Sequence, residues 1–261
     1  TYRMIFWLES QPVSVIVVIG YALCFSMAAA TFIVGWLLSR TRFADDLGFV
    51  TPTLLTPLGV ILGLLLVFLS SRVWTNVDRA GAASGREATA VQELRRTADE
   101  MPSAVADPIR DGARTYLEWV RQEDWPRMMS GKGSLNSRLP GLADATMALA
   151  DYNATISGQR AVQEEALAAI EKVRDARRAR ILQSRSFIGR GQWMVVLALY
   201  LHVLLSIATI HVKRRMSMAI ALSMFSSAFA ICFVLLLVYD NPFRSGGLTV
   251  GPVDIETPLA E

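Results

Sequence analysis

Residues 56–100 read TPLGVILGLLLVFLSSRVWTNVDRAGAASGREATAVQELRRTADE. No charged side chain occurs before Arg72, so the segment begins as a membrane span. After Arg72 the composition turns polar, yet apolar or small residues still recur at helical spacings as far as Ala98. The segment therefore predicts one helix of about 45 residues, or about 68 Å, that continues out of the membrane without a break.

Four apolar runs are long enough to cross a bilayer, which takes about 20 residues. They cover residues 13–38, 51–71, 192–212 and 216–239. The 261 residues are 52% hydrophobic and only 19% charged, whereas soluble domains have about 25% charged residues. These counts exclude a soluble single-core enzyme and a disordered chain. They predict an all-α integral membrane protein with four transmembrane helices in two hairpins and a helical soluble insert between the second and third.

The predicted organisation has four parts. Residues 1–73 form the first transmembrane hairpin, 74–190 the soluble helical domain, 191–240 the second hairpin and 241–261 a C-terminal tail. Inside the insert we expect helices over about 103–129, 141–157 and 159–186, from their apolar spacing.

Two positions inside the insert mark helix boundaries. Met101-Pro102 ends the long helix, and the N-cap of the next helix is Ser103 or, with Pro108 as the first helical residue, Asp107. Asp124-Trp125-Pro126 predicts an end or a kink, because proline disrupts a helix interior.

The orientation follows from arginine and lysine counts. Both termini and the insert share one side of the membrane, and the two short loops, which hold five basic residues, lie on the other. Counting about 15 residues of flank beside each span gives ten basic residues on the insert side. We therefore expect the soluble domain and both termini in the cytoplasm.

Several kinds of chemistry have no support in the sequence. The net charge of +3 is too small to indicate nucleic-acid binding, and no glycine-rich phosphate loop occurs. The two cysteines and two histidines lie in or near apolar runs without metal-ligand spacing, so we expect no metal and no cofactor. No GxSxG or HExxH pattern occurs, so the chain is not expected to be an enzyme.

Three sets of residues have both a functional and a structural interpretation. Gly59 and Gly63 form a GxxxG pattern, which permits close helix packing. Arg72 and Trp74 could form a pore mouth, or could anchor the span in lipid headgroups. The third set could bind anionic lipid or anions, or could be a solvated helix face with pairs at i, i+3; it comprises Arg174, Arg177, Arg178 and Arg180.

The second span also resembles the second membrane helix of the bestrophin anion channels. Pro57, Leu62-Gly63, Ser71-Arg72 and Trp74 carry this resemblance. Further motifs are similar to those of a bestrophin-like four-span bacterial membrane family, a domain of unknown function. They are Glu87-Ala88, Tyr116 with Leu117-Glu118-Trp119, Asp124-Trp125-Pro126, residues 174–180, and Asp240-Asn241-Pro242-Phe243 with Gly246.

The resemblance implies an oligomeric channel for small anions, a pentamer in the bacterial inner membrane, surrounded by lipids. It places an apolar pore neck at Thr56, Val60 and Leu64, which lie four apart on one helix face. Bestrophin necks carry larger, aromatic side chains, and their acidic calcium clasp is represented here only by Asp240. These departures favour the alternative, an accessory or scaffold subunit of a larger membrane complex that transports nothing.

Overall fold

The structure is a computed structural model that describes residues 12–41, 44–130, 132–186, 188–243 and 250–251. Every regular element in these residues is a helix. Contacts divide the described chain into two units. The membrane unit contains residues 12–75 and 188–240, and the soluble unit contains residues 76–186 with 241–243 and 250–251.

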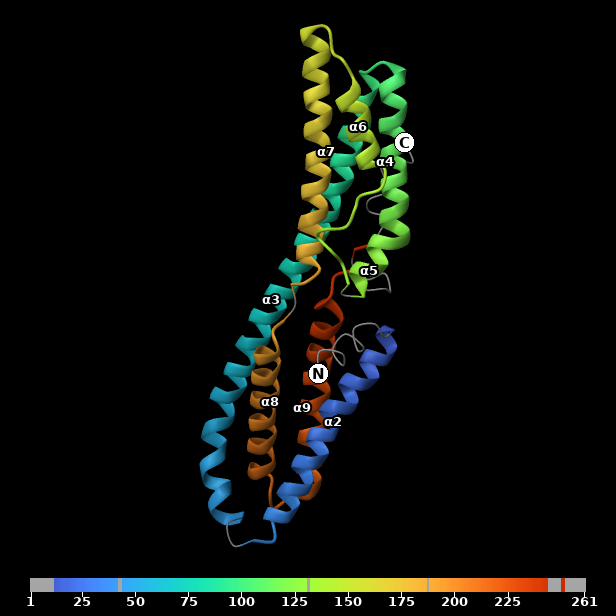
Figure 1. Cartoon of the computed structure of the whole chain (residues 1–261). Coiled ribbons are helices and arrows are strands. Elements are labelled where there is room, and N and C mark those ends of the chain that lie inside the picture. Colours follow the sequence, from blue (N-terminus) through green and yellow to red (C-terminus); the bar gives the residue numbers. More distant parts are fainter. Residues whose placement is uncertain (1–11, 42–43, 131, 187, 244–249, 252–261) are drawn as a thin grey trace. The chain divides into compact units, whose positions relative to one another are not determined.

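The membrane unit is built from four long apolar helices. They are α2 (Val13–Leu38), the first part of α3 (Ala44–Asp99), α8 (Arg190–Ile210) and α9 (Arg215–Tyr239). Each is long and apolar enough to cross a bilayer, which confirms the predicted all-α membrane fold with four spans. Helices α2, α8 and α9 run side by side (Figure 1).

Glycines bring α2 close to α9. A Cβ atom placed on Gly20 would lie 2.5 Å from Cγ2 of Val234. One placed on Gly35 would lie 2.9 Å from Sδ of Met218. Because lipid tails are as apolar as these side chains, close van der Waals packing of this kind holds membrane helices together.

Helix α3 is continuous over 56 residues, from the membrane unit into the soluble unit (Figure 1). The prediction of an unbroken helix is therefore confirmed, although Gly81 and Gly85 lie inside it. Each isolated glycine costs a helix only about 1 kcal/mol, which the neighbouring buried residues Ala80, Ala83 and Ala88 offset by packing.

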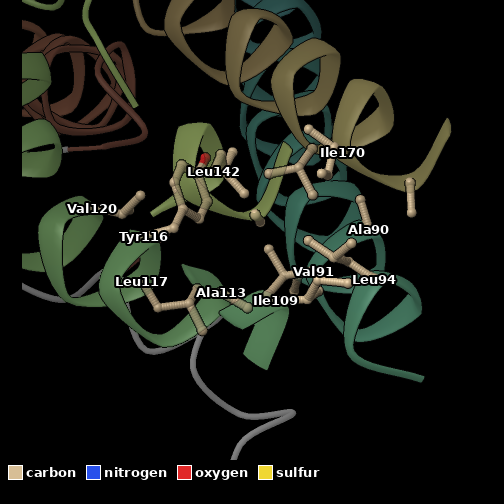
Figure 2. Close-up of a cluster of buried hydrophobic side chains, with 14 of the residues drawn as sticks. Ala90, Val91, Leu94, Ile109, Ala113, Tyr116, Leu117, Val120, Leu142 and Ile170 are labelled. Carbon is tan, nitrogen blue, oxygen red and sulfur yellow. The ribbon is translucent and has the colours of Figure 1, made fainter. Parts of the chain in front are cut away.

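The soluble unit packs the second part of α3 against the remaining helices. They are α4 (Ser103–Trp119), α5 (Trp125–Met129), α6 (Leu142–Asp151) and α7 (Ser157–Gln183). Figure 2 shows their side chains meeting in one cluster, in which Leu94, Ile109 and Leu142 are completely buried. Burial of each such side chain contributes about 1.5–3 kcal/mol.

Helix α4 begins one residue before the first of its two predicted starts. Its N-cap is Pro102 and Ser103 is its first helical residue, so both predicted N-caps, Ser103 and Asp107, are wrong, and Pro108 lies within the helix. Val105 and Ala106 are buried in the cluster, and their burial extends the helix upstream of the proline.

After Trp119, at the end of α4, the helix opens into a π-helical turn, Val120–Asp124, directly before the Trp125-Pro126 pair. The backbone N–H of Trp125 then reaches the carbonyl of Val120, five residues back.

The backbones of α4 and of the turn before α6 touch at two glycines. A Cβ atom on Gly112 would lie 2.5 Å from the carbonyl oxygen of Gly141. Gly141 itself has φ +78°, a conformation that side-chain-bearing residues rarely adopt. No rotamer change relieves a clash with backbone, so this crossing requires glycine.

We therefore predict that Gly112→Ala lowers the free energy of unfolding by about 3 kcal/mol, because the added methyl group separates α4 from α6. The matched control is Gly158→Ala in the first turn of α7, where a Cβ atom meets nothing within 4 Å. The control should gain up to about 1 kcal/mol. Denaturant unfolding of the full chain in detergent measures both, and equal stability of the two variants would contradict the prediction.

Candidate pore-lining face and buried charge network

The membrane part of α3 packs along one side only. Leu62, Leu69 and Val73 are buried against residues of α8 and α9. At about 100° per residue, Val60 lies about 180° around the helix from Leu69. Of the four membrane spans, that of α3 is the least buried within the chain.

The three predicted neck residues lie on the outward face of α3, which we define by Thr56, Val60 and Leu64. All three are exposed, Val60 by 55% and Leu64 by 53%. Gly59 and Gly63 border the same face, and a Cβ atom on either would meet nothing within 4 Å. The structure thus brings the predicted neck residues together on a face that no other part of the described chain covers.

The two residues predicted at the pore mouth, Arg72 and Trp74, contact α8 and α9. Arg72 lies about 120° around the helix from Val60, and its Nη1 donates to Oε1 of Gln192 in α8 at 2.9 Å. The Trp74 ring packs on that of Tyr239 at the end of α9, with centroids 4.9 Å apart. Both side chains therefore join α3 to the second hairpin.

Asp240 closes the end of the second hairpin. It follows α9, is 6% exposed, and its Oδ1 accepts the backbone N–H of Ile188 at 2.8 Å. Burial raises the pKa of this carboxyl to about 6, against the lowering effects of the Ile188 N–H and the charge of Arg72. Asp240 thus fixes the chain just before α8, a structural role for the acidic residue that follows the fourth span.

The soluble unit contains a buried charge network, which we define as Glu87, Tyr116, Asp124, Arg177 and Arg180. Arg180 donates from Nε to Oε2 of Glu87 at 2.5 Å and from Nη2 to Oδ2 of Asp124 at 2.9 Å. Arg177 donates from Nε and Nη2 to the two oxygens of Asp124 at 3.0 and 2.7 Å. The Tyr116 hydroxyl donates to Oε1 of Glu87 at 2.6 Å. These bonds join α3, α4, the π turn and α7.

The network is electrically balanced and nearly dry. Two carboxylates face two guanidinium groups, and the four charged side chains are at most 2% exposed. Burial lowers the pKa of Arg180. The charge and hydrogen bonds of Glu87 raise this pKa by a larger amount, so the net shift is upward. Burial, followed by the charge of Glu87, raises the pKa of Tyr116, which therefore remains a hydrogen-bond donor.

The four arginines predicted to form one anionic-lipid or anion patch lie in two environments. Arg177 and Arg180 are buried in the network, stacked over Trp119 and Trp125. Arg174 and Arg178 remain accessible and pair with Glu171 and Asp175 at i, i+3. Helix α7 therefore turns two of the four arginines toward the core and two toward solvent.

Sequence reasoning missed the network, although the signal was present. Glu87 falls in the same spacing as Val91, Leu94 and Ala98 on the buried side of α3. Arg177 and Arg180 lie within the buried seam of small and apolar residues of α7, between Val173 and Ile181. A charge at a core position indicates a buried partner, but the sequence cannot say which residue that partner is.

The fold is that of a helical membrane protein with four candidate spans and a second, soluble helical unit, and the span of α3 has one face that the described chain does not cover. The family model of the bestrophin-like domain matches residues 13–255, and the chain therefore belongs to the bestrophin-like family.

One solved structure is similar in fold. It is a bacterial bestrophin homologue from Klebsiella pneumoniae that carries a point substitution, with 13% identity and a TM-score of 0.61. The match covers 94% of this chain and 99% of that one. Comparison with curated proteins finds no match.

We predict that Asp124→Asn lowers the free energy of unfolding by about 3–5 kcal/mol, because two buried guanidinium groups lose their shared charge partner. The control, Asp175→Asn, removes the carboxylate from an exposed pair and should change stability by less than about 0.5 kcal/mol. Thermal unfolding followed by tryptophan fluorescence compares the two. A loss for Asp124→Asn no larger than that of the control would show that the network contributes little.

The raised pKa of Asp240 predicts a pH dependence. The folded chain favours the protonated carboxyl, so this group's stabilisation is present below about pH 4 and is lost as the pH rises through about 6. The loss is about 3 kcal/mol for a shift of about two pKa units. Asp240→Asn keeps the acceptor for Ile188 and should be the more stable form at pH 7.5, with no decline between pH 4 and 6. Melting curves across this range measure it, and Asp111→Asn, at an exposed site, should retain the decline.

Proposed function

We propose that the chain assembles into a channel for small anions, with the outward face of α3 lining the neck of the pore. Membership of the bestrophin-like family supports an ion channel rather than an enzyme. A single copy presents only one wall of a pore, so conduction requires several copies around an axis. Similarity to the family supports a homo-oligomer, for which we propose five copies.

The observation that carries this proposal is the composition of the exposed face. It combines the apolar Val60 and Leu64 with two glycines and with the polar Thr56, all of them exposed. An uncovered glycine surface favours a neighbouring helix over lipid.

The neck chemistry fits a small anion that is partly dehydrated. From Thr53 to Val77 the helix carries no acidic residue, so no carboxylate repels an anion. Val60 and Leu64, repeated around an axis, would form two apolar rings, and such rings gate by losing their water. Arg72, on the α8 side of the helix, adds positive charge near one end of the span.

We propose the bacterial inner membrane as the location, with the soluble unit and both termini in the cytoplasm. The four spans and the family support a membrane protein. The excess of basic residues in the flanks of the insert supports this orientation. The remaining exposed apolar residues of α2 and α9, such as Val18 and Ile231, would contact lipid.

A second candidate is the scaffold subunit. Gly59 and Gly63 are open to any helix that approaches, whether from a second copy or from a different protein. The mass of the complex solubilised from the membrane separates the two candidates. A homo-oligomer favours the channel, and one copy bound to other subunits favours the scaffold.

The test is the reversal potential of the purified protein in a planar bilayer under a chloride gradient. We predict a current that reverses near the chloride potential and changes in size in the double variant Val60→Ala with Leu64→Ala, because the neck becomes wider. The control is Ile231→Ala with Leu235→Ala, an exposed pair with the same spacing on α9, which should conduct like the unmodified chain. Equal effects of the two pairs, or no chloride current from well-folded protein, would contradict the proposed neck.

A further inference from the structure

A cavity lies in the soluble unit where α7, the start of α6 and the segment 132–141 meet. That segment has no helix. Arg177 of α7 donates to the carbonyl of Ser134 at 2.9 Å, and Arg185, just after α7, donates to that of Gly133 at 2.7 Å. The cavity is open to solvent and has a volume of about 520 Å³. None of its lining residues belongs to the outward face of α3.

The walls of the cavity are strongly basic. Arg138 reaches it from the loop, and Arg174, Arg177 and Arg178 reach it from α7. Glu171 is the only acidic residue among the lining residues. Its pair with Arg174 and the pair of Arg178 with Asp175 are i, i+3 pairs with exposed carboxylates, and such pairs contribute less than about 1 kcal/mol.

Two of these guanidinium groups have unused donors. Arg138 is exposed and makes no ion pair within the described residues. Arg177 is buried and engaged through Nε and Nη2, and its Nη1 makes no hydrogen bond within the described residues. Arg177 is also one of the residues that line the cavity.

The first turn of α6 adds backbone donors at the same place. Ala143, in that turn, lines the cavity, and the residue before the helix is Gly141, which has no side chain to cap it. The free N–H groups of a helix start favour an anion, although the exposed Asp144 of this turn weakens the effect.

We propose that this cavity binds a phosphate group. Its donors come from the loop, from α7 and from the start of α6, and a phosphate offers acceptor oxygens in several directions. Guanidinium groups bind such oxyanions through paired hydrogen bonds, more strongly than they hold exposed carboxylates. The volume accommodates a small phosphorylated molecule or the headgroup of a phospholipid. The bound phosphate would join the loop to α7 through Arg138.

The probes that test the site are inorganic pyrophosphate and phosphatidic acid. Calorimetric titration of the full chain in a neutral detergent, at fixed ionic strength, should show saturable binding of one probe per chain. Binding of pyrophosphate indicates a soluble phosphorylated ligand. Binding of phosphatidic acid alone, added in mixed micelles, indicates a lipid headgroup. Binding of neither probe would overturn the proposal.

Variants decide whether the binding occurs in this cavity. Arg138→Gln, at an exposed residue outside the buried charge network, should weaken binding about tenfold, and Arg138→Gln with Arg178→Gln should weaken it further. Arg160→Gln makes the same charge change at an exposed position of α7 outside the cavity and should bind like the unmodified chain. Equal weakening by Arg160→Gln, or unchanged binding in the double variant, would overturn the proposal.

Discussion

Arg180 imposes the strongest constraint on the soluble unit, because a buried guanidinium group must have charge partners. Its partners, Glu87 and Asp124, lie 93 and 56 residues away in the sequence, on α3 and on the π turn. To satisfy one side chain, three helical segments must therefore meet at fixed positions. Such a network adds little net stability compared with an apolar core, but any misplacement leaves a charge unpaired. We infer that it selects one packing of α7 against α3 among several that the small residues of both helices would permit.

Helix α3 connects this constraint to the proposed function. Its second part carries Glu87, and its first part carries the outward face at Thr56, Val60 and Leu64, all in one unbroken helix. This helix packs on one side only and leaves threonine and glycine exposed on the other, and that exposed face is the one that we propose lines the neck.

The sequence predicted the architecture well and the site only in part. Four spans and the continuous α3 follow from length and spacing, which are local properties. The local sequence does not decide the start of α4, because the burial of Val105 and Ala106 in the core extends the helix to Ser103. Proximity in the sequence groups the arginines near the end of α7, whereas the helix turns Arg177 and Arg180 inward and leaves Arg174 and Arg178 accessible. Long-range pairing, such as that of Arg180 with Glu87, has no local signature and could not be derived.

The most direct test of the central claim is the structure of the full-length chain in lipid nanodiscs by electron cryo-microscopy. The account predicts a closed ring of identical copies in which Thr56, Val60 and Leu64 of every copy face a common water-filled axis. A single copy, or a ring in which this face of α3 contacts lipid or a different protein, would contradict it.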